Sequence, residues 1–378
     1  MAKKPKKKIQ QPAADSDIET TIGNLRKTFG DDSIQYGESV VAVEAIPTGI
    51  ACLDVVIGCC GIPRGRITEV YGNESGGKTT LCLHMVASCQ AQGGIVAYID
   101  AEHALDHEWA THIGVDMHKL LISQPNSGEQ ALDILQAIVS SGIVDMVIID
   151  SVAALVPQEE LDGELEDKQV GAQARMMSKA IRKLVSSCKK SRTAVVFVNQ
   201  LRDKIGKGFS PSFMGQPEVT PGGRALKFYS SIRMEVRRAE TLREDNKPYG
   251  IVTKIKIAKN KVAPPFRSTD LDIHHGAKFL GPKALHGVDK AKALSVGAVV
   301  LGVVVVRGSN YYLGGERLAT GSEKFIAALR ADRELYQRVY DATYAAMIST
   351  DKPAKDTDSD ETSEEDNVNL DELRDTDD

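Results

Sequence analysis

The residues with the clearest chemical purpose form one glycine-rich run, Gly72-Asn73-Glu74-Ser75-Gly76-Gly77-Lys78-Thr79-Thr80. The run matches the pattern G-x-x-x-x-G-K-[ST], and it lies between an apolar stretch at 67–71 and a helical stretch at 80–92. In such a setting backbone N–H groups close around phosphates, the lysine reaches the β- and γ-phosphates, and the threonine hydroxyl ligates Mg²⁺. The sequence therefore predicts a nucleoside triphosphate site in which Lys78 binds phosphate and Thr79 binds the metal.

A carboxylate at the end of a neighbouring strand is needed to support such a metal. Residues 146–150 form an apolar stretch that ends in Asp150, which meets this requirement. Hydrolysis also needs a group that orients or deprotonates water, and Asp100 and Glu102 both stand at the end of another apolar stretch. Position favours Glu102, with Asp100 and a purely structural role for Glu102 as the alternatives.

An amide and a long loop follow a fourth apolar stretch, 194–198. Gln200 could sense a γ-phosphate and pass its presence into the loop 201–223, which contains five glycines and three prolines. Loops of more than about 12–15 residues in a compact domain are usually functional or disordered. This loop mixes cations with aromatic rings, which suits a single nucleic-acid strand because phosphates meet cations and bases meet rings. The residues are Arg202, Lys204, Lys207, Phe209 and Phe213.

A second candidate for nucleic-acid binding is the segment 161–171 together with Arg175 and Arg182. The two arginines lie seven residues apart and therefore on one helix face. Taken singly, each cation is more often a solvated surface charge, so the hypothesis depends on the cations acting together.

Length and composition are those of an ordinary globular protein of two or three domains, with 378 residues, 42% hydrophobic and 26% charged. A membrane span needs about 18 to 20 unbroken apolar residues, and the longest candidate, 296–306, contains two glycines. We therefore expect no membrane association and a cytoplasmic location. The six cysteines form no CxxC pair, which favours reduced thiols.

Charge is concentrated at the two ends of the chain. Residues 1–8 carry five lysines, and 351–378 carry 13 acidic against three basic residues, so the body is neutral although the net charge is −5. Both ends have the composition of disordered segments. The acidic end is expected either to compete with DNA for basic sites or to act only as a solubiliser.

The elements that position the chemical residues follow from hydrophobic periodicity. From 67 to 271, short apolar stretches alternate with helical ones, which predicts a parallel sheet covered by helices. The stretches 232–236, 252–258 and 271–273 alternate polar and apolar residues and predict an antiparallel extension. A smaller α/β unit is expected at 283–345, and it ends in an amphipathic run at 323–347.

A short helix is predicted before the sheet. Ser16-Asp17-Ile18-Glu19 forms a capping box, and the apolar residues Ile18, Ile22, Leu25 and Phe29 follow at helical spacing. Gly30 is placed to end the helix. Its single apolar stripe requires a partner surface.

Several strings resemble the bacterial RecA family. Besides the glycine-rich run they are Ile99-Asp100-Ala101-Glu102-His103-Ala104-Leu105-Asp106, Ile149-Asp150-Ser151-Val152-Ala153-Ala154-Leu155, Ala174-Arg175-Met176-Met177-Ser178, Val198-Asn199-Gln200 and residues 221–229. The similarity extends from about 18 to 345. It implies an α/β fold with a RecA-type P-loop ATPase core whose mainly parallel central sheet is flanked by helices, an N-terminal oligomerisation helix and a small α/β C-terminal domain.

The resemblance also implies an organisation of the chain. A disordered basic arm occupies 1–15, the N-terminal helix and linker 16–44, the ATPase and DNA-binding core 45–281, the small C-terminal domain 282–348, and an acidic disordered tail 349–378.

The function implied by the resemblance is that of a DNA-dependent ATPase and recombinase that uses ATP and Mg²⁺. Such a protein forms ATP-gated filaments on single-stranded DNA, pairs that strand with homologous duplex, exchanges strands, and promotes self-cleavage of an SOS repressor of the LexA type. Its implied partners are single- and double-stranded DNA, further copies of the chain, the repressor, and proteins that load and regulate the filament.

The resemblance assigns nucleotide roles residue by residue. Lys78, Thr79 and Thr80 bind the phosphates and Mg²⁺, Asp150 supports the metal, Glu102 activates water, and Gln200 senses the γ-phosphate. Asp106 and Trp109 match positions that hold the adenine. Lys259 and Lys261 match a pair that reaches the nucleotide from the neighbouring subunit.

The DNA contacts implied by the resemblance fall into two groups. Arg175, Arg182, Gly222 and Gly223 match primary contact positions, and Arg237, Arg238, Lys254 and Lys256 resemble a secondary site for the incoming duplex. The loop 201–223 is several residues longer than is usual in the family, so it is open whether Phe209, Phe213 or Met214 inserts between bases.

Other departures from the family pattern are local. Gln169-Val170 stands where His-Met is expected, and Trp109 stands where a tyrosine is usual, which keeps a stacking ring but removes its hydroxyl. Two alternative functions are a RecA-fold hexameric helicase, which needs a closed ring, and a nucleotide-gated scaffold that binds DNA without turnover.

Overall fold

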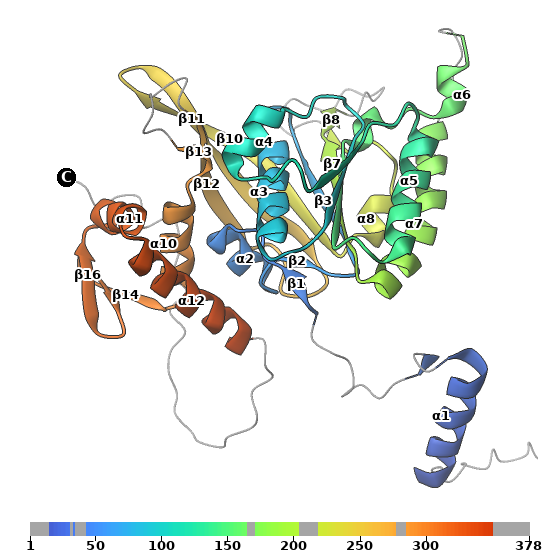
Figure 1. Cartoon of the computed structure of the whole chain (residues 1–378), viewed down its shortest axis with the longest axis horizontal. Helices are drawn as coiled ribbons and strands as arrows, with labels where there is room; N and C mark the ends of the chain where they lie inside the picture. Colours follow the sequence, from blue (N-terminus) through green and yellow to red (C-terminus); the bar gives the residue numbers. More distant parts are fainter. Residues whose placement is uncertain are drawn as a thin grey trace, which may run out of the picture.

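The computed structural model describes residues 15–30, 33–34, 43–164, 171–203, 218–276 and 285–350. At its centre is a nine-stranded sheet with the strand order β13-β12-β11-β10-β3-β7-β6-β4-β5 (Figure 1). The strands are β3 (Ile67–Gly72), β4 (Val96–Asp100), β5 (Leu120–Ser123), β6 (Met146–Asp150), β7 (Ala194–Gln200), β10 (Ile232–Glu244), β11 (Lys247–Asn260), β12 (Ser268–His275) and β13 (His286–Val288).

The sheet combines a parallel part with an antiparallel extension, as the sequence predicts. All pairings from β10 through β3, β7, β6 and β4 to β5 are parallel. The pairings from β10 through β11 and β12 to β13 are antiparallel. Every residue of β3, β4 and β6 is buried, which explains why β4 and β6 are almost entirely apolar.

Helices cover both faces of the sheet. The short α2 (Ala51–Ile57) and the helices α3 (Lys78–Ala91) and α4 (His107–Ile113) pack on one face, while α5 (Gly128–Ser141), α7 (Ala172–Ser191) and α8 (Ala225–Tyr229) pack on the other. Alternate residues of β4 show the division, because Val96 and Tyr98 join the first hydrophobic cluster and Ala97 and Ile99 join the second. Two short strands, β1 (Ala45–Ile46) and β2 (Ile62–Pro63), pair with each other beside the first face.

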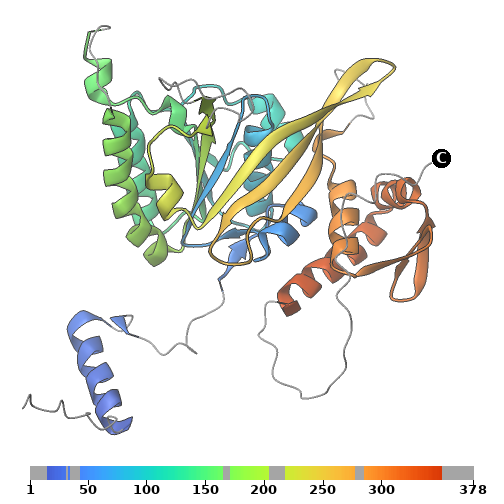
Figure 2. The same ribbon diagram turned by 180° about the vertical axis from the view of Figure 1, so that it is seen from behind.

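The edge strand β5 and the strands β10 and β11 differ from the sequence prediction. β5, which was not predicted, is the edge strand, and its Leu121 and Ile122 are 49% and 38% exposed, so it lacks the buried pattern of the other strands. β10 and β11 are much longer than predicted because they continue past the sheet as a two-stranded ribbon (Figure 2). Irregularities in their register, such as the one between Arg238 and Glu240, accompany this extension.

The N-terminal helix α1 (Asp15–Phe29) begins one residue before the predicted cap at Ser16 and ends at Gly30 as predicted. Gly30 has a φ of 94°, and its N–H donates to the carbonyl of Arg26 at 2.8 Å. The helix stands apart from the body of the protein (Figures 1 and 2). Phe29 of its apolar stripe is 71% exposed.

A small C-terminal unit packs around its own hydrophobic core. It consists of α10 (Lys290–Val300), the antiparallel strands β14 (Val304–Arg307), β15 (Asn310–Leu313) and β16 (Glu316–Thr320), and the helices α11 (Ser322–Ala331) and α12 (Arg333–Thr350). The amphipathic run predicted at 323–347 forms two helices, α11 and α12, because Asp332 interrupts it. The Asp332 carboxylate accepts the backbone N–H groups of Glu334 and Leu335 at 2.9 and 3.0 Å, and it thereby starts α12.

Two sequence expectations concern the chain as a whole. Five of the six cysteines are buried, where they pack as small apolar groups. Among the helices that the structure describes, none combines the length and apolar character needed to cross a membrane.

A buried carboxylate joins the C-terminal unit to α2. Asp54 is wholly buried, accepts the backbone N–H of Thr48 at 3.0 Å, and accepts the hydroxyl of Tyr344 from α12. Burial raises the pKa of Asp54 to about 6, against the hydrogen bonds from Tyr344 and Thr48, which lower it. The native chain therefore holds a proton there that the unfolded chain releases between about pH 4 and pH 6, so this carboxyl group lowers stability as pH rises through that range.

We expect Tyr344→Phe to destabilise the chain more at pH 7.5 than at pH 5. Above the pKa of Asp54 the lost hydrogen bond is one to a carboxylate and costs about 1.5–3 kcal/mol, whereas below it the partner is a neutral acid and the cost is about 1 kcal/mol. Urea unfolding followed by circular dichroism at the two pH values measures the difference. Tyr336→Phe on the same helix is the control, and an equal loss for Tyr344→Phe at both pH values would contradict the expectation.

Candidate functional site

The glycine-rich loop joins β3 to α3 and can exist only with glycine at its tightest points. A Cβ on Gly72 would lie 1.9 Å from the carbonyl oxygen of Val236 on β10. Gly77 has a φ of 91°, and a Cβ there would lie 2.5 Å from Cδ1 of Ile273 on β12. Because α3 starts at the very next residue, Lys78, the free N–H groups of its first turn face the loop. The loop lines a hollow of about 290 Å³.

Lys78 points back into the loop. Its Nζ donates to the carbonyl oxygen of Asn73 at 2.6 Å, and the residue is only 9% exposed. Burial lowers the pKa of Lys78, while the nearby carboxylates of Asp150 and Glu102 oppose that change. The Lys78 ammonium group is largely shielded from solvent and lies close to free backbone N–H groups. Such a group is suited to bind an anion such as phosphate.

Thr79 and Asp150 meet above the end of the sheet. The Thr79 hydroxyl donates to Oδ2 of Asp150 at 2.8 Å, and Tyr98 donates to the same oxygen at 2.7 Å. Burial raises the pKa of Asp150, and both hydrogen bonds oppose the rise. Burial also raises the pKa of Tyr98 well above its ordinary value, so its hydroxyl stays a donor. A hydroxyl and a carboxylate are the hard oxygen ligands that Mg²⁺ prefers, so this pair fits a site for that ion.

Glu102 is exposed at the same sheet edge and has two donors. The hydroxyl of Ser151 and Nε2 of Gln200 both donate to its Oε1, the second at 3.1 Å. Asp100, the alternative base, is 2% exposed and accepts Nε2 of Gln124 at 3.0 Å. It also accepts two backbone N–H groups of the loop that follows β4. Asp100 is therefore used to hold that loop, and Glu102 is the carboxylate that water can reach.

Aromatic side chains close the far side of the hollow. Trp109 and His275 line it together with Ile251 and Ile273, and Nε1 of Trp109 donates to the Thr80 hydroxyl at 3.3 Å. Asp106 does not line it, because its carboxylate caps α4 and accepts the N–H of Trp109 at 2.9 Å. Asp106 thus acts through Trp109.

The sequence reasoning missed His275 and Ser151. His275 comes from β12, nearly 200 residues after the glycine-rich loop, and only the sheet order brings it to the hollow. Ser151 adjoins Asp150, so its place directly after a metal-supporting strand was the available signal.

The lysine pair lies away from this hollow. Nζ of Lys259 donates to the carbonyls of Lys227 and Phe228 at 2.7 and 2.9 Å, and Nζ of Lys261 donates to that of Phe228 at 3.3 Å. The backbone hydrogen bonds from Lys261 to Ser231 and from Ser231 to Ile67 set the pair level with the beginning of β3. The glycine-rich loop follows the other end of that strand.

The loop predicted to bind single strands is described only at its ends. Arg202 lies in β8 (Arg202–Asp203), which pairs with β9 (Glu218–Val219), so a short antiparallel ladder closes the base of the loop. Lys204, Lys207, Phe209, Phe213 and Met214 lie outside the described residues, and so do Gln169 and Val170.

Gly222 and Gly223, at the end of this loop, pack against α7. Both have positive φ, and a Cβ would lie 2.9 Å from Val152 at Gly222 and 2.8 Å from Ala174 at Gly223. The N–H of Gly222 donates to Oε1 of Gln173, whose Nε2 donates to the carbonyl of Val152 at 2.9 Å. The end of the loop is thereby tied to α7 and to the 3₁₀ turn after β6.

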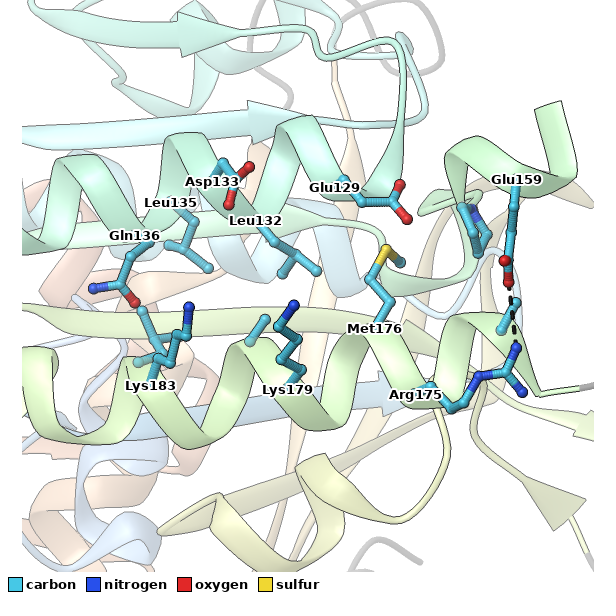
Figure 3. Close-up of a pocket in the computed structure, with 14 residues that line it drawn as sticks. Glu129, Leu132, Asp133, Leu135, Gln136, Glu159, Arg175, Met176, Lys179 and Lys183 are labelled. Carbon is cyan, nitrogen blue, oxygen red and sulfur yellow. Dashed lines mark hydrogen bonds and ion pairs between the residues drawn. The ribbon is translucent and has the colours of Figure 1, made fainter. Parts of the chain in front are cut away.

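Arg175 and Arg182 both lie on the exposed face of α7. Arg175 stands at one end of a groove of about 400 Å³ between α5 and α7, where it pairs with Glu159 of α6 (Gln158–Leu161) at 3.3 Å (Figure 3). Lys179 and Lys183 project from α7 on one side of the groove, and the acidic residues Glu129 and Asp133 belong to α5 on the other. Arg182 lies outside the groove, and its Nε donates to the carbonyl of Ser178 at 3.1 Å.

The predicted secondary site is divided by the pleat of the β10–β11 ribbon. Arg237 is directly opposite Lys254, and Glu235 is opposite Lys256, so Arg237, Lys254 and Lys256 share one exposed face. Arg238 is opposite Thr253, whose hydroxyl donates to the carbonyl of Gly76 at 3.1 Å. Arg238 therefore belongs to the face nearer the glycine-rich loop, and the structure does not bring all four cations together.

The chain is similar to known proteins over most of its length. A family model described as the RecA N-terminal domain matches residues 16–279. The chain is 49% identical over 316 residues to Protein RecA of Heliobacterium modesticaldum, covering 83% of this chain and 87% of the relative. It is 46% identical over 342 residues to Protein RecA of Chlorobium limicola, covering 90% and 94%. It is also 46% identical over 324 residues to Protein RecA of Aquifex aeolicus, covering 85% and 90%.

We expect Gly72→Ala to destabilise the folded chain by about 3 kcal/mol, because the added methyl group overlaps the Val236 carbonyl. Gly76→Ala is the matched control in the same loop, since a Cβ there lies 3.2 Å from its nearest neighbour, the Asn73 oxygen. Thermal unfolding of the two variants measures the difference. Equal midpoints would mean that the close approach of β10 does not constrain the loop.

Proposed function

The chain belongs to the RecA family of DNA recombination and repair ATPases, and on that premise we propose that it binds ATP and Mg²⁺ at the glycine-rich loop and forms ATP-gated filaments on single-stranded DNA. In that state it pairs the strand with homologous duplex, exchanges strands, and promotes self-cleavage of an SOS repressor of the LexA type. Filament loaders and regulators act on it, and it works in the cytoplasm.

One observation carries the ATPase proposal: two hydrogen-bonded pairs of side chains meet at one edge of the sheet. Thr79 is bonded to Asp150, and Gln200 is bonded to Glu102. Lys78 and the N–H groups of the loop bind the phosphates. Thr79 and Asp150 hold Mg²⁺, which when bound offsets negative charge on the phosphate oxygens. Glu102 accepts a proton from the attacking water, and Ser151 orients its carboxylate.

Gln200 links this site to the DNA loop. Its side chain donates to Glu102, and its backbone N–H donates to Oδ1 of Asn199 at 3.0 Å. Nδ2 of Asn199 in turn donates to the carbonyl of Pro221 at the far end of the same loop, at 3.2 Å. A γ-phosphate that draws the Gln200 amide away from Glu102 would move both ends of the loop. This supports coupling between nucleotide state and DNA binding.

Two surfaces support assembly into a filament. Helix α1 presents its apolar stripe to solvent, and the edge of the sheet at β5 carries exposed apolar residues that a second copy could cover. Leu121 and Ile122 of β5 are exposed, and so is Ile95, which directly precedes the neighbouring strand β4. Lys259 and Lys261 lie away from their own glycine-rich loop, and they complete the site of a neighbouring subunit by exchanging the carbonyls that they bind for its nucleotide.

We expect steady-state ATP hydrolysis to be strongly stimulated by single-stranded DNA, and Glu102→Gln to lower the stimulated rate about 100-fold because the proton acceptor is lost. ATP-dependent binding of the variant to DNA should persist, since Gln keeps the shape of the side chain. Wild-type hydrolysis by Glu102→Gln would reassign the base. Hydrolysis that is indifferent to DNA would favour a motor or a scaffold instead.

Mixing of two inactive variants tests the shared site. Glu102→Gln subunits lack the base, and Lys259→Ala/Lys261→Ala subunits lack the lysine pair. In an equimolar mixture about one quarter of random head-to-tail interfaces unite an intact base with an intact lysine pair. We expect recovery of about that fraction of the stimulated rate.

A mixture of Glu102→Gln with Lys78→Ala is the control, because both changes damage the same half of the interface and no interface is intact. Recovery in the control, or none in the test mixture, would contradict completion of the site by the neighbouring subunit.

A further inference from the structure

Tyr98 is a buried tyrosine that belongs to none of the motifs of the site. It lies inside β4, is 1% exposed, and packs its ring in the hydrophobic cluster between the sheet and α3. Its hydroxyl crosses to the neighbouring strand β6 and donates to Oδ2 of Asp150 at 2.7 Å. A buried hydroxyl needs a partner, and here that partner is the carboxylate that fits the metal.

The hydroxyl is not needed to fill the core. Phenylalanine has the same ring, and Val96, the other residue of β4 in this cluster, is apolar. The Tyr98 hydroxyl is buried away from water, and its hydrogen bond with Asp150 compensates for that cost. The feature that distinguishes Tyr98 from phenylalanine is therefore directed entirely at Asp150.

The geometry restricts the Asp150 carboxylate to one orientation. The terminal torsion of an aspartate is broad and roughly two-fold, so a carboxylate held by one donor can turn. Tyr98 and Thr79 approach the same oxygen, Oδ2, from β4 and from α3. The hydroxyl of Thr79 is itself a metal ligand in the proposed site and must adjust when an ion binds. Tyr98 is the donor that can stay in place.

We propose that Tyr98 is a positioning residue that holds the Asp150 carboxylate ready for the Mg²⁺ of the nucleotide complex. The inference rests on the proposed ATP and Mg²⁺ site and concerns only how that site is pre-organised. In other proteins, mutation of a residue that hydrogen-bonds a metal ligand typically lowers metal affinity or activity by about 10- to 100-fold.

The test is the Mg²⁺ dependence of nucleotide binding by Tyr98→Phe, measured without turnover. Binding of a fluorescent ATP analogue is titrated with Mg²⁺ for the wild type, for Tyr98→Phe and for the control Tyr336→Phe on α12, and it is repeated in EDTA. We expect Tyr98→Phe to need about tenfold more Mg²⁺ for half-maximal binding, with its EDTA affinity unchanged. Tyr336→Phe should behave as the wild type.

The outcomes separate the two proposals. A wild-type chain without Mg²⁺-dependent nucleotide binding would overturn the proposed site itself. A normal wild type with an unshifted Mg²⁺ midpoint in Tyr98→Phe would overturn only the role of Tyr98. Equal loss of affinity with Mg²⁺ and in EDTA, or a Tyr98→Phe chain that does not fold, would make the hydroxyl a structural requirement and would also overturn it.

Discussion

The parallel register of the central strands is the constraint on which the site depends. β4, β6 and β7 are hydrogen-bonded so that Asp100 lies level with Asp150 and Ile149 lies level with Phe197. β3 is registered with β7 so that Gly72 is level with Gln200. These strands therefore end together, and residues separated by up to about 130 positions in the chain meet at one edge. A shift of one residue in this register would reverse the face of each side chain and separate the pairs.

A buried polar network next to that edge connects it to the rest of the fold. Glu69 of β3 is fully buried and accepts from Arg233 of β10 and from Nδ2 of Asn199 at 3.0 Å. Arg233 also lies 4.3 Å above the ring of Tyr71, so its charge is compensated from two sides. Because Asn199 also binds the carbonyl of Pro221, the network connects the core of the sheet to one end of the loop 201–223. Asn199, which helps to compensate for the burial of Glu69, thus also holds that end of the loop in place.

The sequence predicted what is encoded locally and missed what the register creates. The glycine-rich loop and Asp150 each depend on a short pattern, a glycine run or an apolar strand that ends in a carboxylate. Tyr98 reads as one more apolar strand residue, and only the pairing of β4 with β6 makes its hydroxyl a neighbour of Asp150. His275 is brought to the hollow by the antiparallel extension, whose strands proved longer than their alternating patterns indicated. β5 was not predicted because it is an edge strand. Its apolar residues are partly exposed, so its sequence lacks the pattern of a buried strand.

The same sheet separates the lysine pair from its own glycine-rich loop. Lys261 is level with the first residue of β3, and the loop begins at the sixth, which is about 17 Å further along the strand. Lys259 and Lys261 point their ammonium groups at the carbonyls that end α8, where they satisfy groups that a helix terminus leaves unpaired. A flexible lysine side chain can exchange those carbonyls for the phosphates of a nucleotide bound to another subunit. It cannot reach the glycine-rich loop of its own subunit, because the rigid sheet keeps the two apart. Under the proposed function, the geometry of one subunit thus makes the nucleotide site complete only in the assembly.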